Sequence, residues 1–88
     1  MEKTITISNR LGLHARAASL FVKEAEPFPC KVEIEKDGVR INAKSIMGIL
    51  MLAAPFGSTI TISCAGEQEA ECLQTLVSLV ENKFNEEN

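Results

Sequence analysis

The sequence predicts an α+β fold: an open-faced sandwich in which a four-stranded antiparallel sheet is covered on one face by three helices. Three observations support it. Short segments alternate between apolar and polar residues, longer segments repeat apolar residues at helical spacing, and an Asp-Gly pair joins two of the alternating segments. The expected order is β-α-β-β-α-β-α. With 88 residues, the chain should form one domain over residues 1–88.

Four segments, at residues 3–8, 31–36, 39–43 and 59–64, alternate with the period of half-buried strands. Asp37 and Gly38 supply the positive φ angles of a two-residue hairpin turn, so the second and third strands should be antiparallel neighbours. The residues expected to point inward are Ile5, Ile7, Val32, Ile34, Val39, Ile41, Ile60, Ile62 and Cys64.

Two amphipathic helices are expected to cover the sheet. The first lies between His14 and Pro27, and Pro27 should end it by holding Glu26 in extended angles. The second begins at about Glu67, and its acidic first turn suits the helix dipole. The apolar stripe of the first helix is Ala18, Phe21, Val22 and Ala25, and that of the second is Leu73, Leu76, Val77, Val80 and Phe84.

The short helix expected after Ser45 has apolar side chains on every side, which a surface helix should not have. In so small a domain some of them must face water. Alternatively, Ile49, Leu52 and most of the others simply fill the core. Exposed apolar patches of this kind usually bind another protein, and methionine suits partners of varied shape. The expected docking residues are Ile46, Met47, Leu50 and Met51.

The charge distribution argues against a general nucleic-acid binder. The formal net charge is −3, with +2 in residues 1–44 and −5 in residues 45–88, so there is no basic stripe. Tyr and Trp are absent and none of the four strands carries Phe, which removes the stacking platform of RNA-binding modules with a similar element order. A small cationic site for one anion or one acidic partner remains compatible with this charge.

Membrane, metal and redox classes receive no support either. The longest apolar run, residues 46–56, is interrupted by glycine and proline and is too short to span a membrane. The first residues lack the pattern of a secretory signal, so a cytoplasmic location is expected. Cys30, Cys64 and Cys72 form no C-x-x-C pair, which disfavours a copper chaperone and a zinc site. We expect ordinary buried or half-buried thiols, with no metal and no cofactor.

The segment of residues 9–18 places the single histidine where a glycine-containing loop meets a helix. Backbone amides at a helix start are unpaired and carry partial positive charge, so Ala15 and Arg16 should hold a phosphate, with the Arg16 guanidinium gripping its oxygens. The same environment favours a neutral His14 ring with a free nitrogen as nucleophile. Alternatively, His14 only caps the helix or packs on the sheet.

Two motifs decide between these interpretations. Gly12-Leu-His-Ala-Arg-Ala-Ala resembles the active-site signature of the HPr family, the histidine-containing phosphocarrier proteins of the bacterial phosphotransferase system. Ala43-Lys-Ser-Ile-Met-Gly-Ile-Leu resembles the regulatory-serine segment of that family, at the usual separation from the histidine. The resemblance spans nearly the whole chain, including its length and element order.

The resemblance implies a phosphocarrier, a transfer intermediate rather than a stand-alone catalyst. His14 would accept a phosphoryl group from the phosphoenolpyruvate-dependent first enzyme and pass it to a sugar-specific enzyme IIA, with Arg16 stabilising the phosphohistidine. Lys23, Lys44 and the apolar patch would dock these acidic partners. Ser45, also the expected N-cap of the short helix, would be the site of an HPr kinase/phosphorylase. The protein is expected to be a monomer.

Some features leave alternatives open. Many members of the family have proline where this chain has Ala17, and some carry a basic residue where it has Gly48, which bears on partner preference. Relatives that lack the histidine act only in regulation, and His14 argues against that subgroup. The nitrogen-related branch, whose phosphoryl chain regulates potassium or nitrogen metabolism, is the main alternative to sugar transport.

Overall fold

The structure, a computed structural model, describes residues 1–86 and has the predicted architecture. The strands are β1 (Glu2–Thr6), β2 (Lys31–Lys36), β3 (Val39–Asn42) and β4 (Thr59–Ala65). The helices are α1 (Ala15–Ala25), α2 (Ile46–Leu52) and α3 (Glu69–Glu81), and a short 3-10 helix, Lys83–Asn85, follows. The order β-α-β-β-α-β-α is confirmed for the main elements.

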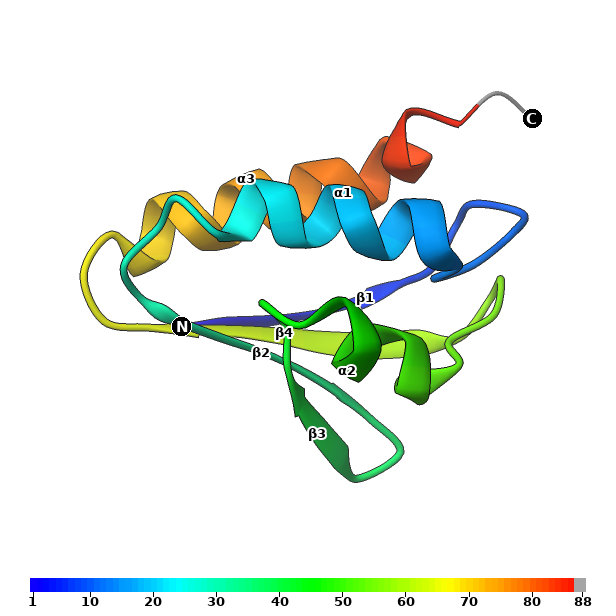
Figure 1. Ribbon diagram of the computed structural model, residues 1–88, viewed down its shortest axis with the longest axis horizontal. Coiled ribbons are helices and arrows are strands. Elements are labelled where there is room, and N and C mark those ends of the chain that lie inside the picture. Colours follow the sequence, from blue (N-terminus) through cyan, green and yellow to red (C-terminus); the bar gives the residue numbers. More distant parts are fainter. Residues whose placement is uncertain (87–88) are drawn as a thin grey trace.

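The sheet is antiparallel throughout, in the order β1-β4-β2-β3. Its central register sets Ile62 of β4 opposite Ile34 of β2, and Ile60 of β4 opposite Ile5 of β1. Helices α1 and α3 lie along one face of the sheet (Figure 1), where Phe21 and Leu76 are fully buried. On the other face the hydroxyl groups of Thr4 and Thr61 form an exposed hydrogen bond. Within residues 1–86 this face is open to solvent, as the sequence predicts.

The predicted hairpin is confirmed, but its second strand is less buried than expected. Asp37 and Gly38 have φ angles of 51° and 81°, and the pair Lys36 and Val39 closes the turn. Val39 was expected to point inward but is 56% exposed, and Ile41 is only half-buried. Strand β3 lies at the edge of the sheet, where α1 and α3 do not cover it. The apolar side chains of β3 therefore remain partly exposed although they alternate with polar ones.

Two helix ends differ from the predictions. Glu26, expected in an extended conformation, is right-handed helical, because its N–H donates the last helical bond to the Val22 carbonyl. Helix α3 ends at Glu81, whereas the sequence predicts that it continues to Phe84. Phe84 has a left-handed φ of 53° in the 3-10 helix, yet it is only 2% exposed. Its ring anchors the C-terminal segment to the core.

The loop from β1 to α1 is held against the loop from α2 to β4 by main-chain contacts. The Leu13 N–H donates to the Ala54 carbonyl at 2.9 Å, and Ile7 exchanges hydrogen bonds with Gly57 and Ser58. Gly12 has φ +67°, and a Cβ there would lie 2.5 Å from the Ala54 carbonyl oxygen. Only glycine combines this backbone conformation with so close an approach.

We expect Gly12→Ala to destabilise the fold more than Gly38→Ala. Gly38 also has a positive φ, 81°, but a Cβ there would meet nothing within 4 Å, so its variant should lose about 1 kcal/mol from backbone strain alone. Gly12→Ala adds a clash with the main chain and should lose a further ~2 kcal/mol or more. Urea unfolding followed by circular dichroism measures both losses. Equal losses would mean that the close approach of the two loops does not hold in solution.

Candidate functional site

His14 stands at the N-cap of α1, with extended backbone angles. Its carbonyl accepts the first helical hydrogen bond from Ala18, but its side chain makes no capping bond. The amides of Ala15 and Arg16 donate no hydrogen bond to any residue in the described chain, 1–86. The interpretation of His14 as a mere cap therefore does not hold, and two amide donors are available beside it.

The imidazole ring contacts a carboxylate that sequence reasoning missed. Nε2 of His14 lies 2.7 Å from Oε2 of Glu86, and the side chain of His14 is 27% exposed. Asn9 donates through Nδ2 to the same carboxylate oxygen at 2.8 Å, and also to the Gly12 carbonyl. The sequence predicts only the positive helix start beside the ring. The structure adds a negative group, because Glu86, 72 positions along the chain, contacts one ring nitrogen.

Glu86 is ionised in this arrangement. The pKa of its carboxyl is lowered, first by the hydrogen bond with His14 and then by the one from Asn9 and the nearby charge of Arg16, which together outweigh burial. A carboxylate only accepts hydrogen bonds, so Nε2 of a neutral ring must carry the proton. The other nitrogen, Nδ1, then keeps its lone pair, and it has no hydrogen-bond partner within residues 1–86.

No local sequence signal indicates the contact of Glu86 with His14, because the position of Glu86 depends on how the nearby Phe84 packs into the core. Phe84 is buried and three successive residues, Lys83 to Asn85, adopt positive φ angles that turn the chain back toward α1. The burial of Phe84 could be expected from its apolar character, but the turn after α3 could not. The buried Asn9 was likewise overlooked, as it sits in the loop without a pattern that marks it.

Arg16 is exposed on the first turn of α1 and forms no ion pair with any residue of the described chain. Together with Leu11, Asn85 and Glu86 it lines a shallow hollow of about 420 Å³ next to the histidine loop. Its guanidinium is thus near the expected phosphate position and available to a ligand.

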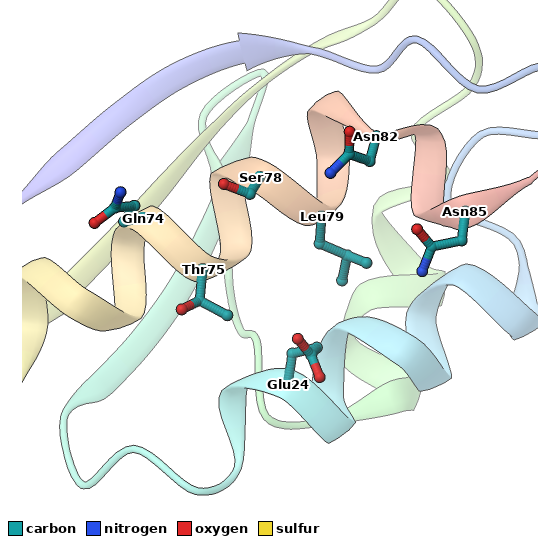
Figure 2. Close-up of a pocket in the computed structure, with 7 residues that line it drawn as sticks. All are labelled: Glu24, Gln74, Thr75, Ser78, Leu79, Asn82 and Asn85. Atoms are coloured by element: carbon teal, nitrogen blue, oxygen red, sulfur yellow. The ribbon is translucent and has the colours of Figure 1, made fainter.

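A second hollow, of about 430 Å³, lies between α1 and α3 (Figure 2). Glu24 of α1 faces it together with polar side chains of α3 such as Thr75 and Ser78. Its lining includes this carboxylate and no lysine, arginine or histidine. An anionic ligand is therefore disfavoured in this hollow.

Helix α2 presents the expected apolar surface. Ile46, Met47 and Met51 are 41%, 68% and 79% exposed, whereas Leu50 is half-buried against the core. Ile49 and Leu52 are buried, as predicted. We call Ile46, Met47, Leu50 and Met51 the α2 patch. Sequence reasoning missed two further exposed apolar residues, Leu11 at 68% and Phe56 at 61%, in the two loops that the Leu13–Ala54 bond joins.

The two lysines expected beside this patch differ in their surroundings. Lys23 is exposed in the last turn of α1. Lys44 is half-buried, and its ammonium donates to the Phe28 carbonyl just beyond α1. Lys44 is therefore engaged in holding the chain after α1, which the sequence pattern did not indicate, while the charge of Lys23 faces solvent.

Ser45 is the N-cap of α2, as expected: its Oγ accepts a hydrogen bond from the Gly48 amide at 3.1 Å. It is half-buried. A Cβ on Gly48 would lie 3.1 Å from the Asn42 carbonyl oxygen and 3.4 Å from Ser45. A larger residue at position 48 would therefore press on the segment that carries Ser45.

The family model for the phosphotransferase-system HPr component phosphorylation site matches residues 1–82. Curated relatives include the HPr-like protein Crh of Halalkalibacterium halodurans, 45% identical over 94% of this chain and 99% of its own. The phosphocarrier protein HPr of Pseudomonas aeruginosa is 47% identical over 93% of this chain and 92% of its own.

Solved structures give the same result. HPr of Thermoanaerobacter tengcongensis has a TM-score of 0.96 and 46% identity, and the match covers 100% of this chain and 99% of that one. A dimer of HPr from the same organism matches with a TM-score of 0.79. No helix within residues 1–86 combines the length and apolar character needed to cross a lipid bilayer. By sequence and by structure, the chain belongs to the HPr family of phosphocarrier proteins of the bacterial phosphotransferase system.

Proposed function

We propose that His14 is the phosphoryl acceptor and that Nδ1 is its reactive atom. The observation that carries this proposal is the hydrogen bond of Nε2 with the ionised Glu86, which leaves the lone pair of Nδ1 available. That lone pair attacks phosphorus of the phosphorylated first enzyme, and the bond from phosphorus to the donor breaks. Transfer to enzyme IIA is the reverse process with a different partner.

The start of α1 supports the phosphorylated state. The unpaired amides of Ala15 and Arg16 and the partial positive charge of the helix favour an anion on the ring. The exposed guanidinium of Arg16 adds charge-assisted hydrogen bonds, each worth about 1.5 to 3 kcal/mol. These groups stabilise the phosphohistidine, so Arg16 and the amides hold the phosphate while His14 carries it.

The α2 patch is proposed as the docking surface for both partners, with the exposed Lys23 contributing positive charge. Its exposed side chains lie on the helix that follows Ser45, and the bond between Leu13 and Ala54 links this region to the histidine loop. One partner surface that covers the patch would thus also meet His14. The protein is proposed to act as a monomer in the cytoplasm, although a related HPr forms a dimer.

Ser45 is proposed as a regulatory site for an HPr kinase/phosphorylase. A phosphate there adds about −1.5 to −2 charges at neutral pH. It would stand at the edge of the α2 patch and oppose acidic partners. The relation to Crh, at 45% identity, makes a regulatory function the second candidate, alongside the nitrogen-related branch. The presence of His14 favours phosphocarrier activity.

Incubation with phosphoenolpyruvate and the first enzyme should add one phosphoryl group that is labile in acid and stable in base. His14→Ala should abolish this label, because it removes the acceptor, and Ser45→Ala should keep it. Mass spectrometry and acid treatment measure the outcome. Equal labelling of His14→Ala would show that the phosphoryl acceptor lies elsewhere.

The same experiment with ATP and HPr kinase tests the regulatory proposal. An acid-stable label that Ser45→Ala removes and His14→Ala keeps supports regulation at Ser45. Label on another serine contradicts it. Transfer from the phosphorylated protein to enzyme IIA domains of sugar transporters or of the nitrogen-related branch then separates the two branches by their relative rates.

Met47→Glu should slow phosphoryl transfer at least about tenfold, because a new negative charge would meet acidic partners. Its side chain is 68% exposed, so the free energy of unfolding should change by no more than about 0.5 kcal/mol. Val39→Glu is the matched control: Val39 is 56% exposed but belongs to the edge strand β3. If both variants slow phosphoryl transfer equally, or if Met47→Glu unfolds, the α2 patch is not the docking surface.

Glu86→Ala should change the protonation pattern of the neutral ring, which ¹⁵N NMR of His14 reports. In the wild-type protein the proton should reside on Nε2, and the variant should show a mixture of both forms with transfer reduced about fivefold, the worth of one hydrogen bond. The pKa of Glu86 is lowered in the folded protein. The contact therefore stabilises the fold at pH values above the ordinary carboxyl pKa, and this stabilisation is lost as the pH falls through the lowered pKa. Glu81→Ala serves as the control, and an unchanged ring in Glu86→Ala would contradict this role.

A further inference from the structure

Three cysteines that are far apart in the sequence meet at one place in the fold. Cys30 precedes β2, Cys64 lies in β4 and Cys72 lies in α3. Their sulfur atoms are all within 4.8 Å of one another, and all three residues are buried. The start of β2, the end of β4 and the start of α3 gather at the end of the molecule opposite the start of α1 (Figure 1). The cluster is therefore separate from the histidine site.

Two of these thiols, those of Cys64 and Cys72, have raised pKa values. Burial raises the pKa of Cys64 and of Cys72, and for Cys72 the neighbouring thiols raise it further. The groups that act on the two thiols are the other cysteines and, for Cys64, the amino terminus of Met1, which donates to the Cys64 carbonyl. No lysine or arginine side chain contributes. The cations nearest the cluster already have partners: the Lys44 ammonium donates to the Phe28 carbonyl, Lys31 pairs with Glu33, and the Met1 ammonium pairs with Glu69. A negative complex would therefore have no unpaired cation beside it among residues 1–86.

The geometry suits one centre with three sulfur ligands. Metal–sulfur bonds are about 2.3 Å long, so three sulfurs on one centre lie roughly 3.5 to 4 Å apart. Small side-chain rotations bring sulfurs from within 4.8 Å to that spacing. The group contains no fourth ligand among residues 1–86, whereas structural zinc sites use four. Because the three ligands come from a loop, a strand and a helix, the fold itself sets their arrangement.

Charge then selects the kind of centre. Three thiolates around a monovalent ion carry a net charge of −2 and around a divalent ion −1, and burying either is costly without a partner charge. Three thiolates around a trivalent centre are neutral. A pyramidal trivalent centre also needs only three ligands, which is what the cluster offers.

We propose that Cys30, Cys64 and Cys72 form a binding site for a trivalent thiophilic metalloid, for which arsenite is the probe. Arsenous acid, As(OH)₃, condenses with the three thiols: three As–S bonds form, three As–O bonds break, and each thiol proton leaves with a hydroxyl as water. Arsenic stays trivalent and no thiol is oxidised. The reaction releases water and no free proton, so it leaves no net charge in the buried site.

Cys30 offers the route to the site. It lines a hollow of about 360 Å³ together with residues of β2, and it packs under the turn at Gly66, where a Cβ would lie 3.5 Å from the Cβ of Cys30. Movement of this turn would expose Cys30 first, while Cys64 and Cys72 remain on their strand and helix. The first As–S bond then holds the centre beside the other two thiols.

Native mass spectrometry of the fully reduced protein with sodium arsenite tests the proposal. The expected adduct gains one arsenic and loses three hydrogens, so the mass alone counts the thiols used. An adduct that keeps a hydroxyl, and so uses two thiols, overturns the proposal, as does the absence of an adduct. The wild-type mass decides this even where a cysteine variant fails to fold.

Cys30→Ala, Cys64→Ala and Cys72→Ala provide the matched test. A variant with one cysteine replaced can use only two thiols, so its adduct keeps one hydroxyl on arsenic. The mass gained on binding should therefore exceed the mass gained by the wild-type protein by one water. Arsenite should raise the Tm of the wild-type protein and of His14→Ala, because it crosslinks three elements, and should raise that of the cysteine variants less. Equal Tm increases in wild type and all three variants overturn the proposal. Zn²⁺ or Cu⁺ displacing equimolar arsenite would overturn the choice of a trivalent centre.

Discussion

The close approach of Gly12 to Ala54 and Pro55 is the constraint on which the functional end of the molecule depends. It brings the loop before α1 against the loop after α2, and the Leu13–Ala54 hydrogen bond fixes their relative position. The loop that carries His14 and the loop that follows α2 are therefore held side by side, although they come from separate segments of the chain. Gly12 is therefore required because a side chain at this position would clash with the main chain of Ala54 and Pro55.

The architecture could be predicted from the sequence because its signals are local. The alternation around Ile34 and Ile62, the Asp37-Gly38 turn and the stripe through Phe21 each depend on a few neighbouring residues, and each matches the structure. One error occurred where a local rule met a tertiary one, and the other where two local rules competed. Val39 alternates correctly but lies on an edge strand, and Glu26 kept helical angles because of one hydrogen bond to Val22.

Part of the candidate site could also be predicted, because its signals are local as well. His14, Arg16 and Ser45 stand in short motifs, and their places at the starts of α1 and α2 follow from local helix chemistry. Glu86 was not predictable, because its contact with His14 depends on how Phe84 packs after α3. The cysteine cluster escaped for a related reason: sequence spacing reports ligands within one loop and not ligands that three elements bring together.

The contact between His14 and Glu86 also sets the order in which the protein becomes competent during its synthesis. A nascent chain on the ribosome has translated His14 long before codon 86, and α1 has its sequence complete by residue 25. The imidazole gains its carboxylate only after the segment around Phe84 has left the exit tunnel and docked. The orientation of the ring is therefore acquired only after residue 86 has docked, later than the formation of its own helix.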